Sequence, residues 1–185
     1  MNTDDLSFGQ KIDPATGLVM AWLTHGALDE IAAMDLSDKI ILEYGAGLGD
    51  AWLATRCKKL YVIERNPEWL IKSREIVLAN GITNIEYIPR PCNDCFGKEE
   101  YYCEVPEGVK PDVFISDDAY RYECILKAIE YKPCILIVDN WQQDYVFISP
   151  AAEEAVKPYE GKCFIQADHE NHEGRPWQTG IWNIK

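Results

Sequence analysis

The sequence lacks a long hydrophobic run. No stretch reaches the roughly 18 uninterrupted apolar residues of a membrane-spanning helix. The first residues, Met1 to Asp5, carry neither the positive charge nor the apolar core of a signal peptide. We therefore expect a chain that does not associate with a membrane and that resides in the cytoplasm.

Positive charge is also scarce. The 185 residues include 18 Lys and Arg against 31 Asp and Glu, which gives a formal net charge of -13. A surface of that sign repels phosphate backbones unless a local basic patch overrides it. The densest basic cluster is only Arg56, Lys58 and Lys59, interpreted as a solvated helix end. On this basis we do not expect a nucleic acid as partner.

The cysteines form no regular framework. There are seven, an odd number, in a chain long enough to build a core without disulfides, which indicates a reducing compartment. Cys92 and Cys95 are the closest grouping, and a zinc site there would need His169 or His172 to fold back. Free thiols in a loop are the simpler interpretation.

What the sequence does contain is an alternation of short β-rich runs with helical patterns. The apolar runs are near-continuous, as in parallel strands covered on both faces, and short connections join them to helices. The expected strands are 39–44, 60–64, 84–88, 112–117 and 134–139, and the expected helices are 50–57, 67–80, 120–131 and 150–157. The pattern predicts an α/β fold with a doubly wound, mostly parallel sheet.

The two ends of the chain differ from this pattern. Strands around 163–167 and 179–184 have no good helix between them, which favours a C-terminal antiparallel hairpin. Residues 1–38 form a lead-in with one or two amphipathic helices that either cover the core or cap a site. Residues 39–185 are expected to be one globular domain, with 91–110 a loop, containing at most one short helix, near the ligand.

A glycine-rich turn follows the first strand. Gly45, Gly47 and Gly49 allow backbone to approach a nucleotide-like ligand at the carboxyl end of a parallel strand. A dinucleotide fingerprint would place the third glycine one residue later. The acid Glu43, two residues before the first glycine, suits a ligand with a positive amino group and would be poorly placed beside a pyrophosphate.

A second acid ends the second strand. Glu64 lies 19 residues after Gly45, where a carboxylate can accept hydrogen bonds from both hydroxyls of a ribose. Dinucleotide sites use an acid there too, so this position alone does not identify the cofactor. Glu43, the glycine spacing and the hairpin ending together favour S-adenosylmethionine (SAM) over a nicotinamide dinucleotide.

These residues carry a family resemblance. Residues 40–49 resemble motif I of class I SAM-dependent methyltransferases, and residues 60–69 resemble their second-strand motif. The resemblance implies a seven-stranded Rossmann-like methyltransferase fold, with SAM as cofactor and methyl transfer as activity. The implied cofactor-binding residues are Glu43, Gly45, Ala46, Gly47, Gly49, Glu64, Arg65, Asn93, Asp94 and Asp117, with Asn93 or Asp94 at the adenine.

A narrower resemblance covers two further segments. Residues 117–124 and 177–182 are similar to a group of small, mostly uncharacterised bacterial methyltransferases, so that the likeness extends over nearly the whole chain from about residue 10. Those proteins usually have glycine where this chain has Asp118, so the turn after the fourth strand is expected to differ. This resemblance implies no particular substrate.

Three polar residues end the fourth and fifth strands. Asp117, Asp139 and Asn140 should converge at the edge of the pocket, and their oxygens suit Mg²⁺ or Ca²⁺. The pattern resembles catechol-type O-methyltransferases, in which a cation lowers the pKa of a substrate hydroxyl. The lysine that those enzymes carry shortly after the fourth-strand acid is absent here, and Arg121 is the only basic residue nearby. The alternative is that these residues only cap loops or bond the ligand.

We therefore expect methyl transfer to a small molecule or glycan, to oxygen, with Asp117, Asp139, Asn140 and an alternative base, His172, as catalytic residues. Two other functions remain open, namely a non-catalytic SAM-binding module and an aminopropyl-type transferase. The oligomeric state is not indicated. Further candidates are Tyr120, Trp141, His169 and Trp177 for the acceptor pocket, and Asp13, Thr16 and Gly17 for the amino-acid end of the cofactor.

Overall fold

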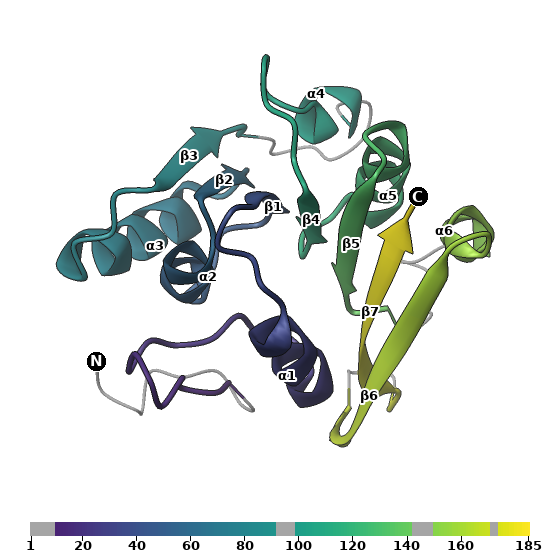
Figure 1. Ribbon diagram of the computed structural model, residues 1–185, viewed down its shortest axis with the longest axis horizontal. Coiled ribbons are helices and arrows are strands. Elements are labelled where there is room, and N and C mark those ends of the chain that lie inside the picture. Colours follow the sequence, from purple (N-terminus) through teal and green to yellow (C-terminus); the bar gives the residue numbers. More distant parts are fainter. Residues whose placement is uncertain (1–9, 92–98, 142–149, 171–173) are drawn as a thin grey trace.

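The computed structural model describes residues 10–91, 99–141, 150–170 and 174–185, with the backbone alone described at 169–170. Its centre is one seven-stranded sheet in the order β3-β2-β1-β4-β5-β7-β6 (Figure 1). The strands are β1 (Ile40–Tyr44), β2 (Lys59–Glu64), β3 (Ile85–Pro89), β4 (Val113–Ser116), β5 (Cys134–Asp139), β6 (Glu160–Glu170) and β7 (Pro176–Ile184). The first five are parallel to one another.

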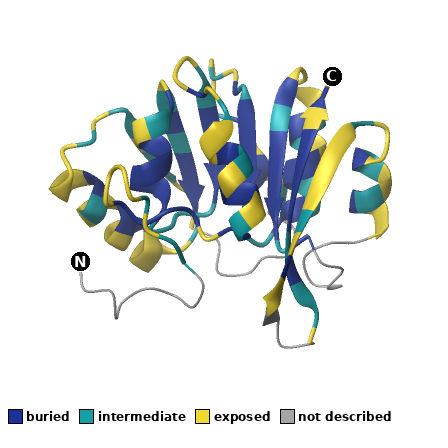
Figure 2. Ribbon diagram, turned by 60° about the horizontal axis from the view of Figure 1, so that its bottom comes forward, coloured by how far each residue is buried: buried dark blue, intermediate teal, exposed yellow. Residues whose placement is uncertain are grey.

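Helices cover both faces of the sheet. Apolar side chains of α1, α2 and α3 pack with one face, and those of α4, α5 and α6 pack with the other, so that the central strands are buried (Figure 2). The helices are α1 (His25–Ala33), α2 (Asp50–Arg56), α3 (Pro67–Ala79), α4 (Glu99–Cys103), α5 (Arg121–Glu130) and α6 (Pro150–Val156). The start of α3 is fixed by Asn66, whose side chain accepts from the Glu68 N–H, and by proline at the first helical position.

The sheet ends in an antiparallel hairpin. Strand β7 pairs antiparallel with both β5 and β6, and its register sets Thr179 opposite Asp139. Both strands are longer than the sequence pattern predicted. The predicted fold class, a doubly wound and mostly parallel sheet with a C-terminal antiparallel hairpin, is confirmed.

The lead-in contains one helix in its described part, α1. Residues 18–21 and 23 are buried without being helical, because the chain pairs with itself through an Ile12–Val19 bridge and a Met20 N–H bond to the Lys11 carbonyl of 2.8 Å. Leu18, Leu23 and the buried face of α1 belong to the same core as β1 and α2. This route carries residues 21–23 over the carboxyl end of β1, next to the glycine-rich turn.

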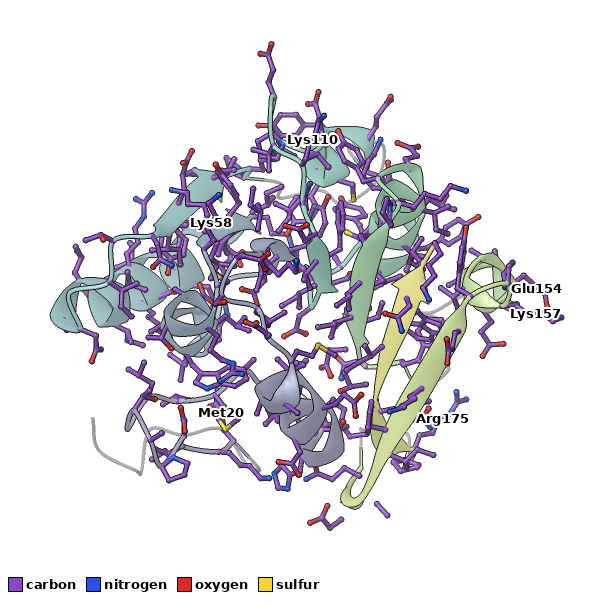
Figure 3. The ribbon with its side chains drawn as sticks, viewed as in Figure 1. Met20, Lys58, Lys110, Glu154, Lys157 and Arg175 are labelled. Atoms are coloured by element: carbon purple, nitrogen blue, oxygen red, sulfur yellow. The ribbon has the colours of Figure 1, made fainter. Side chains whose placement is uncertain are left out.

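In the described part of the chain, no helix is both long and apolar enough to cross a membrane. The segment 91–110, expected to be a loop with one short helix, contains α4. The four labelled basic side chains in Figure 3, Lys58, Lys110, Lys157 and Arg175, lie far apart around the molecule.

Candidate functional site

The glycine-rich turn is closely packed at both ends. Gly45 has φ +102°, and a Cβ atom there would lie 2.6 Å from the Asp117 carbonyl oxygen. A Cβ atom at Gly49 would lie 2.3 Å from the Cα of Ala21 in the lead-in. A side chain at either position would force backbone apart, so both glycines are needed to hold the turn between β4 and the lead-in.

Glu64, at the end of β2, lies beneath this turn. Its carboxylate accepts a hydrogen bond of 2.6 Å from the Ala46 N–H and a second from the Asn66 N–H. The residue is buried, and desolvation raises its pKa. Glu64 therefore fixes the turn to the end of β2. It is not among the residues that line the adjoining cavity.

A cavity of about 420 Å³ opens over the turn, a volume within the usual range for small-molecule sites. It collects residues from the lead-in, the turn, and the ends of β2, β4, β5 and β7. The lining residues are Gln10, Ala21, Trp22, Leu23, Glu43, Gly45, Ala46, Gly47, Leu48, Gly49, Asp50, Arg65, Trp69, Ile115, Asp117, Asp118, Ala119, Arg121, Asp139, Asn140 and Trp177. Seven predicted residues of the cofactor site thus meet around one cavity, namely Glu43, Gly45, Ala46, Gly47, Gly49, Arg65 and Asp117.

Glu43 is the most unusual group of this cavity. It is 5% exposed, and its Oε2 atom has no hydrogen-bond partner. Desolvation raises its pKa well above the ordinary value, and Asp50, Asp117 and Glu64 add Coulomb repulsion. A buried carboxylate oxygen without a donor is costly. A hydrogen-bond donor in the cavity, preferably a cationic one, would remove the cost of burying this oxygen without a partner.

Asp50, the first residue of α2, adds a second buried carboxylate. It accepts from the Gly47 N–H at 2.7 Å and from the Ser73 hydroxyl at 2.5 Å. Burial nevertheless raises its pKa to about 7, because desolvation outweighs these hydrogen bonds. No feature of the sequence indicated that an acid at this helix start would line the ligand cavity.

Arg121, the first residue of α5, ties together the ends of β4 and β5. Its buried guanidinium donates to the Asp117 carboxylate at 3.2 Å, the Asn140 amide oxygen at 2.7 Å and the Asp139 carbonyl at 2.7 Å, and also to the Asp118 carbonyl. The four-residue spacing of Asp117 and Arg121 was the available signal in the sequence, but no site role was predicted for Arg121.

Asp139 is held from the side of β7. The Trp177 indole N–H donates to its two carboxylate oxygens at 3.1 and 3.3 Å, and the Thr179 hydroxyl donates at 2.8 Å. The Thr179 oxygen in turn accepts from the Thr24 N–H of the lead-in at 3.0 Å. Desolvation raises the pKa of Asp139 to about 6 even though these donors and Arg121 oppose the rise.

The predicted cation site does not fit this arrangement. Asp117, Asp139 and Asn140 do line one cavity, but their oxygens already accept from Arg121, Trp177 and Thr179. A hard cation needs several oxygens turned toward one point. Among the residues that the structure describes, no group of three or more His, Cys, Asp or Glu side chains could hold a metal ion.

Tryptophans form the rim of the cavity. Trp22, from the lead-in, meets Trp177, from β7, edge to face with ring centroids 6.2 Å apart, and Trp22 remains 41% exposed. Trp69, in the first turn of α3, also lines the cavity, and the Lys72 ammonium lies 4.8 Å from its ring centroid. Of the acceptor-pocket candidates, Trp177 therefore faces the cavity.

Other candidates lie elsewhere. Tyr120 and Trp141 are buried in the core, against Tyr102 and Trp182 respectively. Asp13, Thr16 and Gly17 form a turn of their own, in which the Asp13 carboxylate accepts from the Thr16 hydroxyl, and they do not line the cavity. Asn93, Asp94, His172 and the side chain of His169 lie outside the described residues.

Burial raises the pKa values of carboxylates in this cavity, which makes a prediction for stability. Glu43, Asp50 and Asp139 are buried and have pKa values above those of an unfolded chain, so folding takes up protons as these groups titrate, over a window that reaches about pH 6 for Asp139 and about pH 7 for Asp50. The stability they contribute is present below the unfolded pKa and is lost as pH rises through the folded values. We expect the free energy of unfolding without ligand to be lower at pH 8 than at pH 5.5 by at least about 2 kcal/mol. Urea titrations at the two pH values measure it, and equal or greater stability at pH 8 would contradict the assignment.

The sequence has relatives among curated proteins, although no family model matches it. It is 32% identical over 82 residues to a ribosomal protein L11 methyltransferase of Psychrobacter sp. (strain PRwf-1), covering 43% of this chain and 24% of that protein. It is 27% identical over 115 residues to the protein of that name from Vibrio parahaemolyticus, covering 60% of this chain and 32% of that protein. The chain thus spans a third or less of the length of these relatives.

Solved structures match over most of the chain. An rRNA methylase from Streptococcus thermophilus superposes with a TM-score of 0.60 at 18% identity, covering 87% of this chain and 96% of that one. A precorrin-6y C5,15-methyltransferase from Geobacter metallireducens superposes with a TM-score of 0.59 at 13% identity, covering 93% of this chain and 97% of that one. A protein described as a methyltransferase from Streptococcus mutans, in complex with S-adenosylhomocysteine (SAH), gives 0.58 at 16%, covering 83% and 93%.

The chain has the class I SAM-dependent methyltransferase fold, which confirms the resemblance drawn from its motifs. The strand order, the glycine-rich turn after β1 and the acid after β2 are the features of the chain that carry the resemblance.

The expectation about partners is corrected. The acidic net charge led us not to expect a nucleic acid and to prefer a small molecule or glycan as acceptor. The relatives are named as methyltransferases of a ribosomal protein, and one of the matching structures is an rRNA methylase, which contradicts that expectation. Net charge sums over the whole surface, whereas an acceptor meets one local region, so the sum was a poor guide.

Proposed function

We propose that this chain is a SAM-dependent methyltransferase that binds the cofactor over the glycine-rich turn with the amino-acid end toward Glu43. The unpartnered Oε2 atom of Glu43 inside the cavity supports this most directly, because the α-ammonium group of SAM supplies the cationic donor that this atom lacks. When bound, SAM supplies a methyl group on a sulfonium, which an in-line nucleophile can displace.

The remaining residues of the cavity have roles that follow from their positions. Gly45 and Gly49 let the turn pack against the Asp117 carbonyl and Ala21, which positions the backbone of the turn for the ligand, and Glu64 holds the turn at the ribose end. Asp117 and Asn140, fixed by Arg121, present oxygens to an acceptor at the other end. Fixed donors and acceptors align a nucleophile without reorganisation.

An open acceptor end favours catalysis over a non-catalytic SAM-binding module. In a module that had lost its chemistry, side chains would fill the region of Asp117, Asp139 and Asn140, whereas all three line the cavity here. No feature of the described residues favours aminopropyl transfer over methyl transfer.

Calorimetry and product labelling test the proposal together. We expect SAM and SAH each to bind once per chain and NAD⁺ to give no heat. Methyl-labelled SAM should transfer label to a protein, RNA or small-molecule fraction of a cell extract when the chain is present. NAD⁺ binding without SAM binding would overturn the cofactor assignment. SAM binding with no label in any fraction would instead favour the non-catalytic module.

A further inference from the structure

We propose that the methyl acceptor is an aliphatic amine, which enters the cavity as an ammonium ion between the Trp22–Trp177 pair and Asp117. The inference rests on the proposed methyl transfer and names the acceptor class of the same site. It follows from the charge balance of the cavity, from its aromatic rim and from the partners that its two arginines already have.

The cavity has an excess of negative charge. Its lining carries five carboxylates, those of Glu43, Asp50, Asp117, Asp118 and Asp139, against the guanidinium groups of Arg65 and Arg121. SAM itself contributes a carboxylate, an ammonium and a sulfonium, hence one net positive charge. The raised pKa values of Glu43, Asp50, Asp117 and Asp139 mean that an adjacent cation is needed to hold them ionised. With all five carboxylates ionised and SAM bound, the cavity carries a net negative charge, which favours a second cation and disfavours an anionic acceptor.

The two arginines are largely used within the protein. Arg65 donates to the Asp118 carboxylate at 2.8 Å. Arg121 directs donors to the main-chain carbonyls of Asp118 and Asp139, and its distance to the Asp117 carboxylate is 3.2 Å. The two arginines of the cavity therefore neutralise its carboxylates only in part.

The rim provides the surface that an alkylammonium ion prefers. Ammonium groups are attracted to the faces of tryptophan rings. Trp22 is 41% exposed at the cavity mouth and is braced edge to face by Trp177, whose indole N–H is fixed on Asp139. Trp69 is 37% exposed, but the Lys72 ammonium already lies near its ring, whereas Trp22 offers exposed ring surface to an incoming cation.

Asp117 can take the proton that the acceptor must lose. An ammonium ion has no lone pair, so the nitrogen first gives one proton to the Asp117 carboxylate. Its lone pair then forms the N–C bond to the methyl carbon while the S–C bond breaks and its electron pair passes to sulfur. The products are a methylammonium ion and neutral SAH. Desolvation of its half-buried side chain and the nearby Asp139 raise the pKa of Asp117, which suits it to hold that proton.

A hydroxyl acceptor fits the site less well. An aliphatic hydroxyl is far less acidic than an ammonium ion. The hypothesis of methyl transfer to oxygen relied on a bound cation to lower the pKa of that hydroxyl. The oxygens of Asp139 and Asn140 already accept from Trp177, Thr179 and Arg121, so the Asp117 carboxylate is left without the further oxygen ligands that a cation needs. The nitrogen acceptor needs only a carboxylate base.

Binding of a small probe to the SAH-loaded chain tests recognition. We expect n-butylammonium to shift the Trp22 indole resonance and to bind at least about tenfold more tightly than the neutral isostere 1-butanol, the equivalent of roughly 1.4 kcal/mol. Trp22→Leu should abolish that preference, and Tyr101→Leu, at an exposed aromatic outside the cavity, should retain it. Equal affinity for amine and alcohol would overturn the proposal. Failure of SAH itself to bind would instead overturn the proposed function.

Transfer of label tests the chemistry and separates the sources of the amine. Methyl-labelled SAM is supplied with a lysine-rich protein pool, the same pool with its amines acetylated, a polyamine, or RNA. We expect label in the protein pool or the polyamine, and at least about a tenfold loss from the protein pool on acetylation. Label in RNA, equal label in acetylated protein, or none in either amine while SAH still binds would each contradict an amine acceptor.

Discussion

Gly47→Val is expected to reduce SAM affinity by at least about 100-fold, or roughly 2.7 kcal/mol, with little effect on folding. A Cβ atom at Gly47 meets nothing nearer than the Asp50 carboxylate at 3.7 Å, so the folded chain can accept a side chain there. That side chain would project into the cavity where the turn must lie against the cofactor. Calorimetry with SAM measures the loss, and thermal unfolding without ligand should change by less than about 3 °C.

Two controls give this prediction its specificity. Ala79→Val, at an exposed position at the end of α3, introduces the same side chain away from the cavity and should leave affinity unchanged. Gly45→Val should instead destabilise the fold, because a Cβ atom there lies 2.6 Å from the Asp117 carbonyl oxygen at φ +102°. Normal SAM affinity in Gly47→Val would show that the cofactor does not lie over this turn.

Glu43→Gln is expected to stabilise the ligand-free chain while weakening SAM binding at least about tenfold. The substitution keeps the shape of the side chain and removes a buried carboxylate whose neighbours Asp50, Asp117 and Glu64 repel it. It also removes the negative charge that we assign to the α-ammonium group. Stability and affinity should therefore move in opposite directions, which a residue with a purely structural role would not produce.

The pH dependence of SAM affinity provides a second test of the role of Glu43. Because the pKa of Glu43 is raised, the free chain carries a proton there at lower pH, and binding of an ammonium ion must release it. SAM affinity should rise with pH until the folded pKa is passed, and calorimetry in two buffers should detect proton release. Asp50, with a pKa of about 7, also faces the cavity and contributes to the slope.

In Glu43→Gln the pH dependence should become weaker and proton release should fall. Glu75→Gln, an exposed glutamate on α3, removes the same charge outside the site and should change neither quantity. Unaltered affinity and proton release in Glu43→Gln would refute the assignment of Glu43 to the amino-acid end of the cofactor.

The sequence by itself determined the order and type of the elements. Near-continuous apolar runs such as 134–139 can be satisfied only as strands buried on both faces, and Asn66-Pro67 fixes a helix start through local capping. The glycine-rich turn and Glu64 were identifiable from the spacing of the glycines and acids along the chain, although the packing of the turn against Asp117 and Ala21 was not. A hairpin at the end followed from the lack of a helix between the last two runs.

Tertiary structure decided which polar groups are available to a ligand. Sequence placed Asp139 and Asn140 at a strand end, but their use by Trp177, Thr179 and Arg121 depends on the antiparallel register of β5 and β7 and on the approach of α5. The local chain contains no signal for such contacts across the fold. The cation hypothesis was drawn from residue types, strand ends and a resemblance, and it therefore counted oxygen atoms that already accept hydrogen bonds within the fold.

The lead-in is a second place where the sequence pattern did not predict the conformation of the chain. Its apolar spacing predicted helices, yet residues 18–23 stay non-helical because pairing with residues 11–12 and burial against the core outweigh local helical preference. That route brings Trp22 to the cavity mouth and Ala21 against Gly49. The cofactor end of the site was thus set by local sequence around the turn. The residues at the acceptor end come from segments distant in the chain, from Trp22 to Trp177, which meet only in the folded protein. Folding also fixes which buried charges remain without partners, and for that reason the sequence alone could not define this end.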